Sequence, residues 1–112
     1  MIKVYQIQLT DEEIEIANEG GSTDRIEAYM GRGFESMFKA ENFQYYTHVA
    51  NLDTTDMEEA FMFMNLWEDE SKVERLGRCS SMSVGDILEL EDGSKYRCAS
   101  FGFTLLENYQ KD

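Results

Sequence analysis

Proline is absent from this 112-residue sequence, and cysteine, histidine and tryptophan are scarce. Without proline, or any low-complexity tract or repeat, no segment reads as a linker. Cys79 and Cys98 are too few for a disulfide framework and lack Cys-x-x-Cys spacing, so we expect reduced thiols. His48 has no partner at ligand spacing, so we predict a hydrogen-bonded strand residue. We therefore expect no metal ion and no other cofactor.

Long apolar runs are also missing. No stretch approaches the roughly 20 residues that a membrane-spanning helix needs. The start of the chain, residues 1–5, lacks the basic-then-apolar layout of a secretory signal peptide. We therefore expect a cytoplasmic location (that of a host cell if the protein is viral) and no membrane partner.

Positive charge is scarce and unevenly placed. The chain has 23 acidic and 10 basic residues, which gives a net charge of −13. Residues 1–70 hold 16 of the acids and 4 of the bases. Such a field repels nucleic-acid phosphates, so we expect no direct nucleic-acid partner. Three explanations of the acidity stay open: solubility or a saline habitat, a basic protein partner, and mimicry of DNA.

The first 42 residues contain one clear strand and several short helices. Residues 2–9 alternate as a strand with Tyr5, Ile7 and Leu9 on one face. Thr10 and Glu13 form a capping box that starts a helix, and a glycine pair ends it. Residues 22–42 predict two short helical pieces with a break at 31–33.

The middle of the chain predicts a strand over residues 43–52 and a helix over about 56–66, opened by a second capping box from Thr55 to Glu58. Along this helix one apolar stripe should pack on the sheet with Phe61 near its centre; the stripe is Met57, Ala60, Phe61 and Met64. Further apolar residues lie off the stripe: Met62, Phe63 and Leu66. They are covered either by residues 67–76 or by a partner or second copy.

The last third predicts a turn at 83–86 and a hairpin over 86–101. A three-residue loop ending at Gly93 sets Leu88 opposite Tyr96 and Glu89 opposite Lys95, which pairs apolar with apolar and acid with base. Gly102 predicts a bulge before a strand over 103–106. The whole chain, 1–112, is then a single α+β domain in the order β-α-α-β-α-β-β. We expect a mixed or antiparallel sheet of about four strands with helices on one face.

Several motifs resemble a family of small uncharacterised proteins from tailed phages, prophages and other mobile elements. The most specific are Ser-Met-Ser-Val-Gly-Asp over residues 81–86 and Phe-Gly-Phe over residues 101–103. Leu-Thr-Asp-Glu-Glu over residues 9–13 and Asp-Met-Glu-Glu-Ala-Phe over residues 56–61 also match. The C-terminal part is similar to the YodL-like domain of larger mobile-element proteins. The resemblance implies a viral or mobile-element origin and supplies no catalytic residue.

These observations favour an accessory protein that acts by binding a host or viral protein, which is basic if the acidity is functional. The candidate contacts are exposed helix acids and off-stripe apolar residues: Asp11, Glu12, Glu15, Glu58, Glu59, Met62, Phe63 and Leu66. A homodimer through the apolar residues is a further alternative. So are a DNA-mimic inhibitor of a nucleic-acid-binding protein and a small carboxylate or metal-dependent enzyme. We expect no enzymatic activity and predict no catalytic residue.

Overall fold

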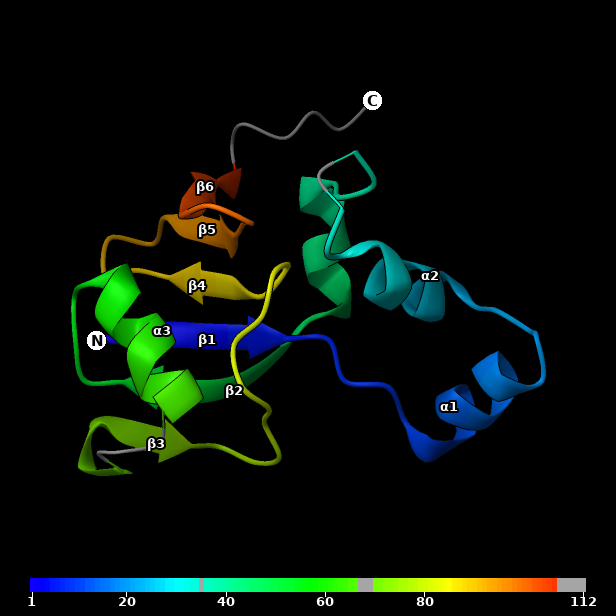
Figure 1. Cartoon of the computed structure of the whole chain (residues 1–112), viewed down its shortest axis with the longest axis horizontal. Coiled ribbons are helices and arrows are strands. Elements are labelled where there is room, and N and C mark those ends of the chain that lie inside the picture. Colours follow the sequence, from blue (N-terminus) through cyan, green and yellow to red (C-terminus); the bar gives the residue numbers. More distant parts are fainter. Residues whose placement is uncertain (35, 67–69, 107–112) are drawn as a thin grey trace.

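In the described part of the chain, six strands form one antiparallel sheet in the spatial order β3-β2-β1-β4-β5-β6 (Figure 1). The structure is a computed structural model that describes residues 1–34, 36–66 and 70–106. The strands are β1 (Ile2–Gln6), β2 (Thr47–Leu52), β3 (Val73–Arg75), β4 (Ile87–Glu89), β5 (Lys95–Cys98) and β6 (Phe103–Leu105). The predicted α+β class is confirmed, whereas the sheet has six strands and not about four. β3 was not predicted, because its three residues are too few for an alternating pattern to reveal, and β6 was predicted only as a continuation of the preceding strand beyond a bulge.

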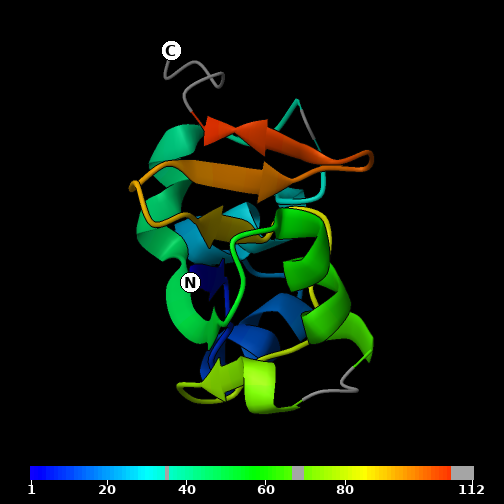
Figure 2. The same ribbon diagram turned by 90° about the vertical axis from the view of Figure 1, so that its left-hand side faces the viewer.

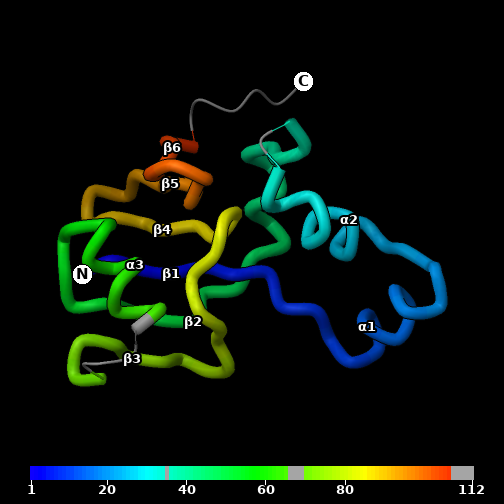
Figure 3. The backbone as a smooth tube through the Cα atoms, in the orientation of Figure 1, coloured from blue at the N-terminus to red at the C-terminus, as the bar shows by residue number. Residues whose placement is uncertain are grey.

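Helical segments connect the first three strands. They are α1 (Asp11–Asn18), α2 (Asp24–Gly31), the 3-10 helix η1 (Ala40–Tyr45), α3 (Met57–Leu66) and the 3-10 helix η2 (Glu70–Lys72). The tube in Figure 3 shows the chain leaving the end of β1, passing through α1 and α2 beyond the sheet, and returning to β2. None of the described helices is long and apolar enough to span a bilayer.

The helices begin where side chains satisfy their first amide groups. The capping box at Thr10 is confirmed, because its hydroxyl accepts a hydrogen bond from the Glu13 amide while Glu13 accepts from the Thr10 amide. At α3 the cap lies one residue later than predicted. The Asp56 carboxylate, not the Thr55 hydroxyl, accepts from the amide of Glu58 at 2.9 Å.

The β4–β5 hairpin has the predicted register. Leu88 faces Tyr96 and Glu89 faces Lys95, while the Leu90 amide donates to the Ser94 carbonyl and so closes the three-residue loop. Gly93 takes a positive φ of 89° in that loop. The pairing of apolar with apolar and of acid with base across the strands thus predicted the register correctly.

Gly102 does not form the predicted bulge. The Ala99 amide donates to the Gly102 carbonyl at 3.0 Å, and Cys98 faces Phe103 in the next pair of residues. The segment is therefore a tight turn between two antiparallel strands, and β6 is a separate strand at the edge of the sheet. The positive φ of Gly102, 72°, suits such a turn.

Both faces of the sheet are covered, which corrects the expectation of helices on one face. Figure 2 shows α3 on one side of the strands and η1 on the other. The face under α3 holds the larger buried cluster. The opposite face holds a smaller one, in which Ile87 and Phe38 are buried and Tyr5 and Phe43 pack at their edge. Adjacent residues of a strand point to opposite faces of the sheet, so Leu88 belongs to the larger cluster and Ile87 to the smaller one.

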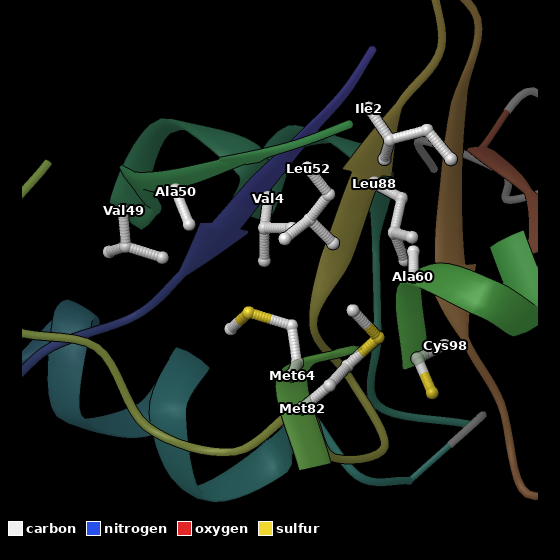
Figure 4. Packing of buried hydrophobic residues seen from close by; sticks show 10 residues of the cluster. All are labelled: Ile2, Val4, Val49, Ala50, Leu52, Ala60, Met64, Met82, Leu88 and Cys98. Carbon is white, nitrogen blue, oxygen red and sulfur yellow. The ribbon is translucent and has the colours of Figure 1, made fainter. Parts of the chain in front are cut away.

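Figure 4 shows the larger cluster, in which the sulfur-containing side chains of Met64 and Met82 lie against the strands. Ile2 and Val4 are its contribution from β1. The predicted face of this strand, Tyr5 with residues 7 and 9, was wrong. The strand ends at Gln6, and Tyr5 points to the other side, where its ring meets Phe43 edge-on with centroids 4.9 Å apart.

The buried face of α3 is rotated from the predicted stripe. Ala60 and Met64 are fully buried, and Met57 and Phe63 pack against the same cluster. Phe61 was expected near the centre of the sheet but is 37% exposed. Every residue advances about 100° around a helix, so Phe61 and Phe63 lie on opposite flanks of the Ala60–Met64 line. Packing places Phe63 inward and leaves Phe61 facing outward.

Candidate functional site

A mainly apolar groove of about 600 Å³ lies between α3, the turn over residues 83–86 and the β5–β6 hairpin. We call it the α3–hairpin groove. Its walls include Phe61 and Met62 from α3, Val84 from the turn, and Cys98 and Phe103 from the hairpin. Its size lies within the range of roughly 300–1,000 Å³ that small-molecule and peptide-anchor sites usually occupy.

The α3 wall exists because the helix is apolar on more than its buried face. Met62 is 51% exposed and Phe61 37% exposed, and both line the groove. Glu58, one turn before Met62, lies at the same wall. In the described part of the chain, the groove lining includes one charged side chain, this glutamate, and no lysine or arginine. The groove therefore offers apolar contact beside negative charge.

The turn over residues 83–86 positions Val84 at the groove. The Asp86 amide donates to the Ser83 carbonyl, and the Ser83 amide donates back to Asp86 Oδ2, both at 3.0 Å. Gly85 takes a φ of 100°, and a Cβ there would lie 2.4 Å from the carbonyl oxygen of Arg32. Only glycine satisfies both conditions. The predicted turn over residues 83–86 is confirmed.

Beneath this turn lies a buried polar network. The Gln6 side chain is 3% exposed; its Nε2 donates to Asp86 Oδ2 and to the Ser80 carbonyl, each at 3.0 Å. Burial raises the pKa of the Asp86 carboxyl to about 6, although hydrogen bonds from Ser83 and Gln6 oppose the shift. Asp86 thus ties the end of β1 to the groove turn.

Cys98 lines the groove from below and is nearly buried. Burial, followed by the negative charge of Asp86, raises the pKa of its thiol to about 11. The thiol is therefore protonated at neutral pH and is a poor nucleophile. Cys98 and Cys79 are both free cysteines, as predicted.

The tip of the β5–β6 turn carries the most exposed large apolar side chain of the described residues. Phe101 is 96% exposed and lies between Ser100 and Gly102, which both line the groove. A phenylalanine left in water at a loop tip has no packing role in the isolated chain. It adds exposed apolar surface at the turn whose residues Ser100 and Gly102 line the groove.

A second, smaller pocket of about 360 Å³ lies at the other side of the molecule, between the end of β1, the two N-terminal helices and residues 78–80. Ile14 and Tyr29 line it from α1 and α2, and Arg78 and Cys79 from the opposite side. Arg78 shares this pocket with Ile14 of α1, a helix that carries three acids in its first turn.

The predicted contact residues fall into separate regions. Asp11, Glu12 and Glu15 are exposed on α1, which buries none of its residues. Figure 1 places α1 and α3 at opposite ends of the long axis, which measures 40 Å. The acids of α1 therefore do not share a surface with Glu58 and Glu59, which are exposed on α3.

The apolar candidates also separate. Met62 lines the groove, whereas Phe63 packs against the core cluster. The side chain of Leu66 lies outside the described part. The groove also contains residues that sequence reasoning missed as contacts, notably Phe61, Val84 and Phe103. A signal for Phe103 was present, since the Phe-Gly-Phe run sets two phenylalanines beside a glycine at a turn.

His48 is a strand residue in β2, and its Nε2 lies 2.8 Å from Asn51 Oδ1, as predicted. Across the described ranges, no three histidine, cysteine or acidic residues gather as a metal site. Comparison with family models, curated proteins and solved structures finds no match. What the groove can bind follows from its own side chains.

Proposed function

We propose that this chain is an accessory protein of a phage or another mobile element and that it acts by binding another protein through the α3–hairpin groove. The groove itself carries the proposal, because Phe61 and Met62 in its wall are exposed, and Phe101 is exposed next to the lining residues Ser100 and Gly102. Exposed aromatic and methionine side chains around a concavity are enriched where proteins bind one another. Ser83, Val84, Gly102 and Phe103 belong to the two motifs that carry the phage resemblance and also line the groove.

The partner we propose is a host or viral protein with a basic surface. The chain carries a net charge of −13, and Glu58 stands at the groove wall. Opposite charge on the partner speeds encounter, and apolar contact then holds the complex. The place of action we propose is the cytoplasm of the host cell.

The arrangement supports the alternative functions less well. A DNA mimic needs carboxylates spaced along one ridge, whereas the acids of α1 and α3 lie at opposite ends of the molecule (Figure 1). For a carboxylate or metal-dependent enzyme, the described residues bring no three histidine, cysteine or acidic side chains together as a metal site, and Glu58 is the one acid in the described lining of the groove. Both remain weaker explanations of an exposed apolar groove.

Selection of displayed random 12-residue peptides on the folded chain tests the proposal. We expect enriched peptides to combine bulky apolar residues with lysine or arginine. Met62→Asp places a charge in the groove at a position that is already half exposed, so the fold should survive. We expect it to weaken binding of the enriched peptides at least about tenfold, roughly 1.4 kcal/mol.

Met30→Asp is the matched control, because Met30 is 58% exposed on α2 and does not line the groove. It should leave peptide affinity unchanged. Failure to enrich any peptide, or equal loss of binding in both variants, would show that the groove is not a protein-binding site.

A further inference from the structure

The outer edge of β6 has backbone groups that point away from the sheet. The Cys98 amide donates to the Asp86 carbonyl, and the Gly85 amide donates to the Cys98 carbonyl, both at 2.8 Å. The backbone groups of Cys98 therefore face β4. Cys98 therefore forms no backbone hydrogen bond with its β6 partner Phe103. Hydrogen-bonded and non-hydrogen-bonded pairs alternate along an antiparallel ladder, so Tyr96–Leu105, two residues away, is also a non-hydrogen-bonded pair. The amides and carbonyls of Phe103 and Leu105 then point outward.

β6 is the last strand on this side of the sheet among residues 1–34, 36–66 and 70–106. Its pairing in that range is with β5 alone. Buried or half-buried backbone groups need partners, and an edge strand presents them as a ready row of donors and acceptors. Two donors and two acceptors on three residues suffice for a short added strand.

The two edges of the sheet differ in chemistry. β3, at the opposite edge, reads Val-Glu-Arg, and charged side chains on an edge strand oppose pairing with another chain. β6 reads Phe-Thr-Leu and carries no charge. Of these two edge strands, β6 is therefore the one better suited to pair with a further strand.

The β6 edge is continuous with the groove. Phe103 packs against the core cluster on the α3 face and lines the groove. Leu105 lies two residues on, so it points to the same face, and Thr104 points to the other. A strand added about 4.8 Å beyond β6 would set its alternate side chains beside Phe103 and Leu105 on the α3 face.

We propose that β6 pairs with an extended segment of a partner protein, which becomes a seventh strand. This inference rests on the proposed function and names its mode of binding. Alternate apolar residues of the segment contact the α3–hairpin groove, and lysine or arginine residues between them supply positive charge. Charge complementarity selects a partner over a second copy, since each copy carries −13 and two copies repel each other.

The first test removes an outward donor from β6. Leu105→Pro deletes an amide hydrogen that points away from β5, so the β5–β6 hydrogen bonds remain. We expect the enriched peptides to bind at least tenfold more weakly to this variant. Arg75→Pro, on β3 at the opposite edge of the sheet, is the control. The Leu76 amide donates to the Val49 carbonyl, so the amide of the neighbouring Arg75 points away from β2, as the Leu105 amide points away from β5. Near-ultraviolet circular dichroism of both variants confirms that they are folded.

The second test changes the peptide and leaves the protein intact. N-methylation of alternate residues blocks hydrogen bonds along one edge of an added strand, while methylation in the other phase blocks the opposite edge. We expect one phase to abolish binding and the other to spare it, since β6 offers a single edge.

The outcomes separate this inference from the proposed function. Strand addition is overturned, and the groove stays a binding site, if peptide binding is weakened by Met62→Asp but unchanged by Leu105→Pro and by N-methylation in either phase. Peptides sensitive to Leu105→Pro but not to Met62→Asp would support the edge and overturn the groove. A concentration-dependent dimer that Leu105→Pro dissociates, measured by sedimentation, would identify the occupant as a second copy and overturn the partner proposed here.

Discussion

Asp86, the buried carboxyl beneath the groove turn, makes the stability of the fold depend on pH. It is 3% exposed, and its Oδ2 accepts hydrogen bonds from Gln6 and from the Ser83 amide. Burial raises its pKa from 3.8 to about 6, so the folded chain binds this proton more tightly than the unfolded chain does. The stabilisation from that proton is complete below pH 3.8 and is lost as the pH rises through 6.

We expect this contribution to fall by about 1.4 kcal/mol between pH 5 and pH 7.5, as linkage requires for a shift of this size. Asp86→Asn cannot titrate, so the variant should lack this part of the pH dependence. Urea unfolding of both proteins at the two pH values measures it, and subtracting the variant cancels the other carboxylates. Parallel pH dependence in the two proteins would mean that Asp86 titrates near its ordinary pKa.

At the scale of one element, α3 has two apolar flanks with different roles. Ala60 and Met64 are buried in the core (Figure 4), whereas Phe61 and Met62 face the groove. Stability and binding therefore depend on different residues of the same helix. A change on one flank should leave the other property nearly untouched.

We expect Met64→Ala to lower the free energy of unfolding by roughly 2–5 kcal/mol, because it empties a fully buried site. Phe61→Ala should cost less than Met64→Ala, since Phe61 keeps 37% of its surface exposed whereas Met64 is fully buried. Denaturant unfolding of the two variants gives both values. The reverse order would mean that the helix is rotated about its axis and that Phe61 belongs to the core.

At the scale of the whole molecule, the negative charge is divided between distant helices. α1 and α3 lie at opposite ends of a molecule 40 Å long (Figure 1). The Debye length is about 8 Å at physiological ionic strength and about 30 Å at 0.01 M. Acids on α1 therefore act at the groove in dilute salt and are screened from it under cellular conditions.

The double variant Glu12→Lys with Glu15→Lys should slow association with an enriched basic peptide at 0.01 M salt and leave it unchanged at 0.15 M. Glu58→Lys, in the groove wall, should slow association at both salt concentrations. Dissociation from the α1 variant should match that of the unmodified chain. Stopped-flow measurements of both rates decide the matter. Slower association of the α1 variant at 0.15 M would place a second contact on α1.

Features set by neighbouring residues were predictable. The capping box at Thr10, the turn over residues 83–86 and the register of the β4–β5 hairpin depend on contacts within a few positions. Their chemistry is local, so pattern and side-chain type sufficed. The α+β class followed from the same signals.

Features that depend on contacts between distant parts of the chain were not predictable from the sequence. The position of Phe61 depends on which side of α3 packs on the sheet, because this helix is apolar on more than one side, and residues far along the chain decide that packing. Likewise the place of β6 as the last strand of the described sheet depends on the order of all its strands. The groove arises only where α3, the 83–86 turn and the β5–β6 hairpin meet. Packing between distant segments determines where these three elements come together, and the local sequence pattern of each element does not predict it.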